Sequence, residues 1–314
     1  MFYIKIYIMP IKKKALIMGL NYRNTSSELR GCINDTVKLN LLLTDKFNYS
    51  ENDITIMTDD HSGDLYPNRD NIINQLDTLV NQVINDNLDE IWISYSGHGS
   101  YSIDSGTDEK DGKDETICPL DYSTSGVISD DTIREYLERV PSFCNVICLF
   151  DSCHSGTIVD LKHHYIFNKT KSRKKTVKQR VRRRVKKGRK WRFVNKLVKK
   201  TITVPGTWNW DSSLNSNYSL NSQVISISGC RDHQVSFDVY SQEFGIWGGA
   251  LTNAFIKIIR ECQTELSPQD LCLKLNQHML EKKYTQKPQI CSSYPIRDNY
   301  IFYRNMTDTI ICIN

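Results

Sequence analysis

A cysteine and a histidine in this sequence have neighbours suited to covalent catalysis. His98 lies between two glycines in 94–99 (SYSGHG), and Cys153 lies in 151–156 (DSCHSG). A thiolate attacks carbonyl carbon atoms, and a nearby imidazole serves as its base. Glycines allow a substrate backbone to come close, and N–H groups beside the thiol can stabilise the oxyanion. The pair predicts a cysteine hydrolase with Cys153 as nucleophile and His98 as base.

Each of these residues has a structural interpretation when it stands alone. A buried cysteine behaves as a small apolar side chain, and a histidine between glycines is more often part of the fold. Here the two residues each follow an apolar run and lie 55 positions apart, which favours catalysis. His154 follows Cys153 directly, but adjacent side chains at a strand end point apart. We therefore expect His154 to orient the loop and His98 to act as the base.

The elements that must position this pair alternate between strand and helix patterns. Apolar runs predict strands at 14–20, 53–58, 89–96, 145–151, 223–228 and 299–303. Periodicity predicts helices at 33–47, from Asn68 as N-cap to 83, and at 130–140, 249–261 and 267–282. Strands joined through helices form a mostly parallel sheet, which binds ligands at the carboxyl ends of its strands. His98 and Cys153 each follow such an end.

The composition is that of an ordinary globular protein. The 314 residues are 39% hydrophobic and 25% charged, which allows a full core and excludes wholesale disorder. No apolar run reaches the roughly 18 residues that a membrane span needs. Residues 1–10 lack the pattern of a signal peptide, so we expect an extra strand or an extension there. The ten cysteines form no C-x-x-C pair, which favours a cytoplasmic or nuclear protein over a secreted one.

Basic residues are concentrated in one stretch. Residues 171–200 hold 17 of the 41 Lys and Arg residues and no Asp or Glu, which leaves 24 basic against 36 acidic residues elsewhere. An acidic body suits a cationic substrate or a metal cation. The strand–helix pattern breaks at 161–222, which we interpret as a long, flexible, partly disordered insertion. Its basic part is either a solvated loop or a patch that binds nucleic acid or directs nuclear import.

The segments around His98 and Cys153 resemble the two active-site segments of metacaspases. Other segments that resemble this family are 30–35 (RGCIND), 108–122 (DEKDGKDETICPLDY), 228–232 (SGCRD) and 283–288 (KYTQKP). The resemblance covers about 14–160 and 223–304, which is nearly everything outside the basic insertion. It is specific, because many motifs occur in the same order.

The resemblance to a type I metacaspase core implies a caspase-like (caspase–hemoglobinase) α/β fold. A mostly parallel central sheet flanked by helices would form a single domain with a large basic insertion. The chain would divide into a large catalytic segment at 1–160, a linker at 161–222 and a small segment at 223–314. Metacaspases often cleave themselves after Lys or Arg between the two segments, so self-processing is a third interpretation of the insertion. We expect a monomer.

The resemblance also implies roles for individual residues. Cys153 and His98 would form the catalytic dyad of an endopeptidase, and the N–H groups of Gly99 and Cys153 would form the oxyanion hole. Metacaspases cleave after Arg or Lys, and the pocket for that side chain is called S1. Its positions correspond to Cys32, Asp35, Ser96 and Asp151. The two aspartates would bind the guanidinium or ammonium group.

Calcium is the expected activator, and we expect no organic cofactor. Residues 104–115 form an acidic run that does not fit an EF-hand, so by itself it is equally well a solvated loop. The positions that bind calcium in members of the family favour a Ca²⁺ site in this chain. They correspond to Asp114, Asp130, Asp131 and Asp160, which are all aspartates.

Three other functions compete with a calcium-stimulated peptidase. A catalytically weak regulatory protein would keep the fold, and a nucleic-acid-binding protein would act through 171–200. A clan relative that cleaves after Asp or Asn would need a basic S1 pocket, whereas the pocket expected here is acidic. The favoured partners are therefore proteins or peptides with Arg or Lys at the cleaved bond. Nucleic acid is the less favoured partner, and no membrane is expected.

Overall fold

The computed structural model describes residues 11–103, 113–153, 155, 158–168, 171–184, 191–204, 207–212, 219–229, 238–241, 244–297 and 299–305. Contacts divide the chain into two units, one formed by 1–165 with 211–314 and the other by 166–210. The extra strand expected at 1–10 lies outside the described residues. No helix within the described ranges combines the length and apolarity needed to cross a membrane.

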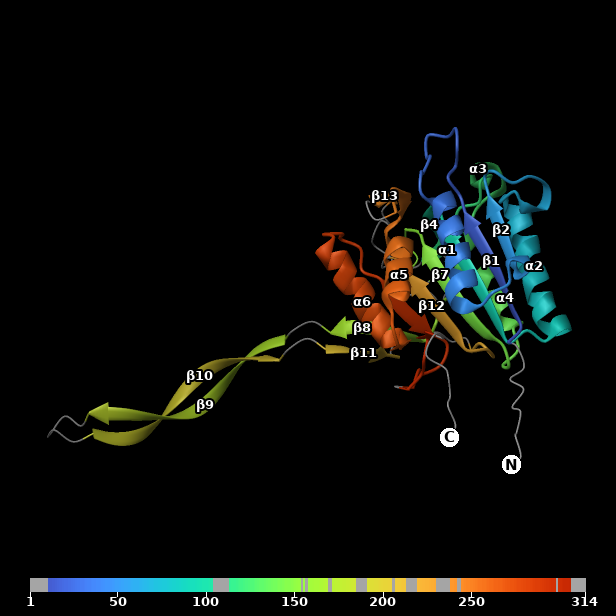
Figure 1. Cartoon of the computed structure of the whole chain (residues 1–314). Helices are drawn as coiled ribbons and strands as arrows, with labels where there is room; N and C mark the ends of the chain where they lie inside the picture. Colours follow the sequence, from blue (N-terminus) through green and yellow to red (C-terminus); the bar gives the residue numbers. More distant parts are fainter. Residues whose placement is uncertain are drawn as a thin grey trace, which may run out of the picture. The chain divides into compact units, whose positions relative to one another are not determined.

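A mixed, mostly parallel sheet lies at the centre of the first unit (Figure 1). Its parallel strands are, in spatial order, β2 (Ile54–Thr58), β1 (Lys13–Gly19), β3 (Glu90–Ser96), β7 (Asn145–Asp151) and β12 (Val224–Ser228). The order continues with the antiparallel strands β16 (Gln289–Ser292) and β8 (His163–Asn168), then β11 (Thr207–Asp211). The five parallel strands match the predicted ones to within one residue at each end, because buried strands read as continuous apolar runs.

Three helices lie side by side on one face of this sheet (Figure 1). They are α1 (Cys32–Phe47), α5 (Ala250–Glu261) and α6 (Pro268–Glu281). Trp92 of β3 is fully buried against this layer, with ring centroids 5.4 Å from Phe47 of α1 and 5.9 Å from Phe255 of α5. These contacts fix how α1 and α5 lie over the sheet.

Two further helices cover the opposite face. They are α2 (Arg69–Asp86) and α4 (Asp130–Glu138). Leu76 of α2 and Leu137 of α4 belong to one buried cluster with Ile93 of β3. Successive residues of a strand face opposite sides, so Ile93 supports this layer while its neighbour Trp92 supports the other. All five predicted helices are therefore present.

Capping residues explain where several helices begin. The side chain of Asn68 accepts a hydrogen bond from the N–H of Asn71 at 2.8 Å, as its predicted role as N-cap of α2 requires. Ser129 and Ser267 cap α4 and α6 in the same way. Pro268 occupies the first turn of α6, where its missing N–H costs nothing.

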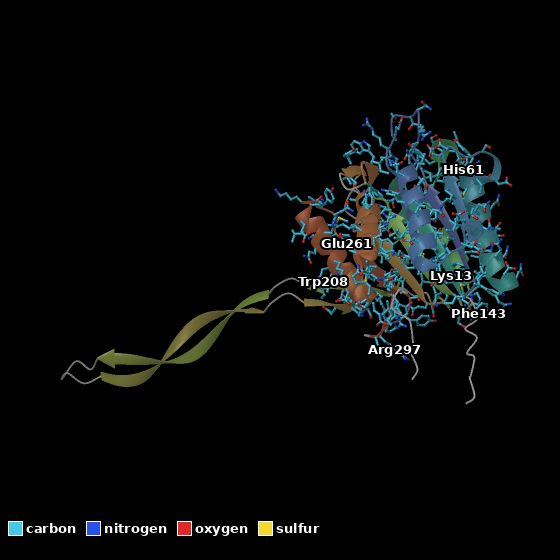
Figure 2. All side chains as sticks on the ribbon, in the orientation of Figure 1. Lys13, His61, Phe143, Trp208, Glu261 and Arg297 are labelled. Carbon is cyan, nitrogen blue, oxygen red and sulfur yellow. The ribbon has the colours of Figure 1, made fainter. Side chains whose placement is uncertain are left out.

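The parallel strands run in one direction, which fixes the end of the sheet that can carry a site. Figure 2 shows Lys13, the first residue of β1, and Phe143, just before β7, at one end of the first unit. His61, which follows β2, lies at the opposite end. The carboxyl ends of the parallel strands therefore lie at the end marked by His61.

The remaining elements were not predicted from the sequence. The strands β4 (Gly99–Ile103), β5 (Lys113–Ile117) and β6 (Ile128–Ser129) form a small sheet. The strands β13 (Asp238–Ser241) and β14 (Ile246–Gly249) form an antiparallel pair. Short helices lie at Glu51–Asp53, Gly63–Leu65 and α3 (Tyr122–Ser125). The last strand predicted at 299–303 is wrong in most of its length. Only Tyr303–Arg304 (β17) is a strand, paired with Glu265–Leu266 (β15).

The second unit contains a two-stranded antiparallel ribbon. Its strands are β9 (Lys171–Arg184) and β10 (Trp191–Val204), paired from Lys171↔Val204 to Arg184↔Trp191. We expected a flexible, partly disordered insertion at 161–222, and basic composition gave no sign of this ladder. The flexibility of the insertion is a separate property, and it stays a prediction.

Candidate active site

The register between β3 and β7 brings the two candidate catalytic segments together. The strands pair in parallel as far as Ser96↔Asp151, so the segments leading to His98 and Cys153 leave adjacent strands at the same level. A Cβ atom added to Gly99 would overlap the carbonyl oxygen of Cys153 and lie 3.2 Å from the Cβ of Ser152. The backbones of the two segments are therefore in direct contact, and Gly99 is required for that approach.

The imidazole of His98 is held in a defined orientation. Its Nε2 lies 2.7 Å from the carbonyl oxygen of Ser27, and its ring is tilted by 44° against the ring of Tyr22, with centroids 4.7 Å apart. A proton on Nε2 would satisfy the Ser27 carbonyl and leave Nδ1 as the basic nitrogen. The backbone is held as well, because the N–H of His98 donates to the Tyr22 hydroxyl at 3.0 Å.

Two buried tyrosines support the histidine segment. The hydroxyl groups of Tyr22 and Tyr95 lie 2.8 Å apart, and the Tyr95 hydroxyl lies 2.7 Å from the carbonyl oxygen of His98. Burial raises the pKa of both tyrosines well above the ordinary value, so they act as neutral hydroxyls. Side chains at Gly97 would collide with this pair, since a Cβ there would lie 2.6 Å from the Tyr95 hydroxyl oxygen.

Cys153 differs from most other cysteines of the described residues in its exposure. Among these, Cys153 and Cys262 are partly exposed and the rest are buried. Burial raises the pKa of Cys118 to about 11 and of Cys148 to about 12, which keeps these thiols protonated. Cys153 thus combines access to solvent with a position beside the histidine segment.

The four S1 candidates also meet at this end of the sheet. All four side chains are buried, and those of Ser96 and Asp151 lie beside Asp35 of α1. Its Oδ2 accepts hydrogen bonds from the Ser96 hydroxyl at 2.8 Å and from the N–H of Gly249 at 2.7 Å. A Cβ at Gly249 would lie 2.9 Å from that oxygen and would overlap the carboxylate of Asp151. Cys32 begins α1, one turn before Asp35.

The two candidate S1 carboxylates have different partners. Oδ2 of Asp151 accepts from both the N–H and the hydroxyl of Thr252, at 2.8 and 2.9 Å. Burial raises the pKa of Asp35 to about 6, the positive charge of Lys38 opposes this shift, and the negative charge of Asp151 adds to it. Two buried carboxylates next to the single ammonium of Lys38 leave one negative charge uncompensated, so this site is suited to a further positively charged group.

Three of the four calcium candidates form an acidic cluster. One oxygen each from Asp114, Asp130 and Asp131 lie within 4.8 Å of one another. Asp130 is almost fully buried and accepts the N–H of Glu115 at 2.9 Å. The carboxylates of this cluster fit a hard divalent cation with oxygen ligands.

Arg134 separates the fourth candidate from this cluster. Its guanidinium forms ion pairs with Asp131 and, at 3.0 Å, with Asp160. Asp160 therefore lies across an arginine from the other three carboxylates.

Comparison with known proteins identifies the family of this chain. The sequence model of the metacaspase peptidase C14 domain matches residues 13–162. Metacaspase-1 of Scheffersomyces stipitis is 36% identical, over 90% of this chain and 71% of that protein. Metacaspase-1 of Schizosaccharomyces pombe is 34% identical, over 92% and 69%. The chain belongs to the metacaspase family. This membership confirms the cysteine-type peptidase and the caspase-like α/β fold expected from the sequence.

A solved structure supports the fold of this metacaspase independently. Protein GSU0716 of Geobacter sulfurreducens superimposes with a TM-score of 0.56 over 93% of this chain and 97% of that one, at 18% identity. Similarity at that identity concerns the fold alone.

Several residues of this metacaspase site were missed by sequence reasoning. Tyr22, Ser27 and Tyr95 hold His98, while Gly249 and Thr252 donate to the candidate S1 carboxylates. Glycine pairs such as Gly248–Gly249 before an apolar helix were a usable signal for close backbone approach. The tyrosines gave no local signal, because their partners lie far away in the sequence.

A methyl group at Gly99 is expected to disrupt catalysis. In Gly99→Ala the new Cβ would overlap the Cys153 carbonyl, so one of the two backbones must shift. A displacement of about 1 Å at reacting groups costs about 100-fold in rate, and we expect a loss of this size in kcat/KM. Ser100→Ala, at the next residue of β4, adds no atom and should keep normal activity. Unchanged kinetics in a folded Gly99→Ala protein would show that the two segments do not meet in this way.

Proposed function

We propose that this metacaspase is a Ca²⁺-stimulated endopeptidase that cleaves after Arg or Lys and uses Cys153 with His98. The observation that carries the proposal is the meeting of three features at one sheet end. The histidine and cysteine segments touch at Gly99, and two buried carboxylates lie nearby, Asp151 at the end of β7 and Asp35 on α1.

The proposed chemistry is acyl transfer through a thioester. The Cys153 thiolate attacks the carbonyl carbon after the substrate's Arg or Lys, and the N–H groups of Gly99 and Cys153 bind the resulting oxyanion. His98 gives a proton to the leaving amine, which breaks the peptide bond. Water, deprotonated by His98, then attacks the thioester and releases the acid. The Ser27 carbonyl, 2.7 Å from Nε2, would hold the imidazole as its charge changes.

Self-processing in the basic insertion is part of this proposal. The segment 161–222 lies between Cys153, which follows β7, and the strand β12, and it is rich in the residues that the S1 pocket would accept. A protease binds its substrate as an extended, unpaired strand, so any bond within β9 or β10 must first leave the ladder. Incubation of the wild type and of Cys153→Ala, followed by mass spectrometry, tests for a cut that needs the thiol.

Calcium would bind to Asp114, Asp130 and Asp131. A bound Ca²⁺ supplies positive charge, which would offset the repulsion among these three carboxylates and order the segments that carry them. Arg134 already supplies one positive charge to Asp131 and Asp160. The guanidinium and Ca²⁺ would therefore compete for Asp131.

Removal of this arginine should strengthen calcium binding. In Arg134→Met, the carboxylate of Asp131 loses its competing cation, and we expect the Ca²⁺ concentration for half-maximal effect to fall about tenfold. Without Ca²⁺ the variant should melt at a lower temperature, because carboxylate repulsion is less compensated. Calorimetric titration and thermal melting measure both effects.

The matched control is Arg139→Met. Arg139 directly follows α4 but pairs with the exposed Asp77, so it should leave the Ca²⁺ midpoint unchanged. Equal midpoints in Arg134→Met and the wild type would argue against competition at Asp131.

Hydrolysis of fluorogenic peptides tests the proposed function directly. Peptides with Arg, Lys or Asp before the reporter group would be assayed with and without added Ca²⁺. Cleavage restricted to Arg and Lys, and faster with Ca²⁺, supports the proposal. Cleavage of the Asp peptide would contradict the acidic S1 pocket. Equal cleavage rates with and without Ca²⁺ would contradict the proposed role of Ca²⁺ as an activator.

A further inference from the structure

A buried lysine lies beside the candidate S1 carboxylates and has no part in the function proposed above. Lys38 lies on α1, one turn after Asp35, and its Nζ is 2.9 Å from Oδ1 of Asp35. The same Nζ lies 2.5 Å from Oδ1 of Asn253 on α5 and 5.5 Å from the centroid of the Phe244 ring. A carboxylate, an amide oxygen and an aromatic face all favour a cation.

The ammonium group of Lys38 is fixed in this position. Its side chain is 7% exposed, and that of Asp35 is 3% exposed. A Cβ atom at Gly248 would overlap Nζ and would lie 2.7 Å from Oδ1 of Asp35. The backbone of β14 therefore covers the ion pair and restricts where the lysine can go.

We propose that Lys38 is a specificity-determining residue of the S1 pocket, whose resident ammonium reduces the charge met by a substrate from two negative charges to one. The inference rests on the proposed Arg/Lys specificity, because it assigns Asp35 and Asp151 to that pocket. A pocket with one net negative charge matches one substrate cation, and the complex is then neutral.

The surroundings of Asp35 show how Lys38 would act. The charged groups that face Asp35 are Lys38 from its own helix and Asp151 from the end of β7. Ser96 of β3 and Gly249 of β14 contribute neutral donors. Burial raises the pKa of Asp35 to about 6, and the positive charge of Lys38 prevents this pKa from rising further.

Loss of the ammonium should therefore move the titration of Asp35 upward. An opposite charge at this distance lowers the pKa of a carboxyl by about 1–3 units, so its removal raises the pKa by a similar amount. In the wild type, we expect KM for an Arg peptide to rise as the pH falls through about 6, since Asp35 then loses its charge. In Lys38→Met, this rise should occur at a pH at least about one unit higher.

The second expected effect lies on the alkaline side of the profile. There both carboxylates are ionised and the internal cation is missing, so Lys38→Met should have a lower KM than the wild type. The two KM–pH curves should cross, which a merely structural role of Lys38 would not produce. Lys46→Met, near the end of the same helix, removes the same charge and should reproduce the wild-type curve. An unchanged inflection in Lys38→Met would overturn the proposal.

A second variant keeps the test valid if Lys38→Met does not fold. Asn253→Asp leaves Lys38 in place but sets a carboxylate where the amide oxygen now lies, 2.5 Å from Nζ. The new charge draws the ammonium from Asp35, so the KM inflection should again move to higher pH. A wild-type curve for this variant would equally overturn the proposal.

Binding without turnover separates this inference from the proposed function. Calorimetry on Cys153→Ala would measure n-butylguanidine, with the neutral n-butylurea as control, across the same pH range. Preference for the guanidinium that shifts with Lys38→Met supports the inference. Preference without the shift overturns the role of Lys38 alone, and no preference overturns the S1 assignment with it.

Discussion

Replacement of Cys153 by alanine is expected to lower kcat/KM for an Arg peptide by about 10⁴-fold or more. The sulfur forms the bond to the acyl group, and a methyl group offers no electron pair for that step. Removal of the nucleophile from a hydrolase with an assembled site has an effect of this size, and what remains comes from oxyanion stabilisation and binding. Initial rates over a range of enzyme concentrations give the ratio.

Cys262→Ala is the matched control for this variant. Cys262 is also partly exposed, but it follows α5 and bonds to the carbonyl oxygen of Thr264. It should keep normal kcat/KM. If Cys153→Ala retained a tenth of the activity, the nucleophile would have to be another group. An Arg chloromethyl ketone should attach to Cys153 in the wild type, which peptide mapping would show.

The sequence predicted the parallel part of the fold because most of those strands are almost completely buried; the edge strand β2, which is half-buried over Ile54–Ile56, is still rich in β-branched residues. The sequences of β3 and β7 are apolar runs, and each is followed by a residue that can take part in catalysis, His98 after β3 and Cys153 after β7. The antiparallel strands β8 and β16 carry His163, His164 and Gln289, so no apolar run marks them. Their pairing depends on long-range contacts that single-sequence patterns do not report.

The candidate catalytic pair could be picked out from the sequence, whereas its supporting contacts could not. His98 lies between two glycines and Cys153 is followed by a Ser-Gly pair, and such patterns are rare enough to notice. By contrast, Lys38 looks like any polar residue of an amphipathic helix, and its partner Asn253 is 215 positions away. What makes Lys38 unusual is burial between α1 and α5, and burial is a property of packing. The S1 aspartates were reached through the family resemblance, because each alone resembles a turn or cap residue.

Replacement of Asp151 by asparagine is expected to reduce kcat/KM for Arg peptides by about 10³-fold. Loss of one partner from a buried charge pair costs about two to five kcal/mol or more of binding free energy, and the free-energy equivalent of a thousandfold fall in kcat/KM lies within that range. The amide oxygen of asparagine can still accept from the N–H and the hydroxyl of Thr252, which Asp151 now binds. The fold should therefore survive while the charge is lost.

The ratio of Arg to citrulline peptides isolates the effect of charge. Citrulline has the shape of arginine without its positive charge, so the wild type should prefer Arg strongly, and Asp151→Asn should remove most of that preference. Asp77→Asn, at an exposed position paired with Arg139, should keep the wild-type ratio. A folded Asp151→Asn protein with the same Arg preference would mean that the substrate cation is bound elsewhere. If the preference disappears and the citrulline rate is unchanged, Asp151 acts through its charge and not through the geometry of Cys153.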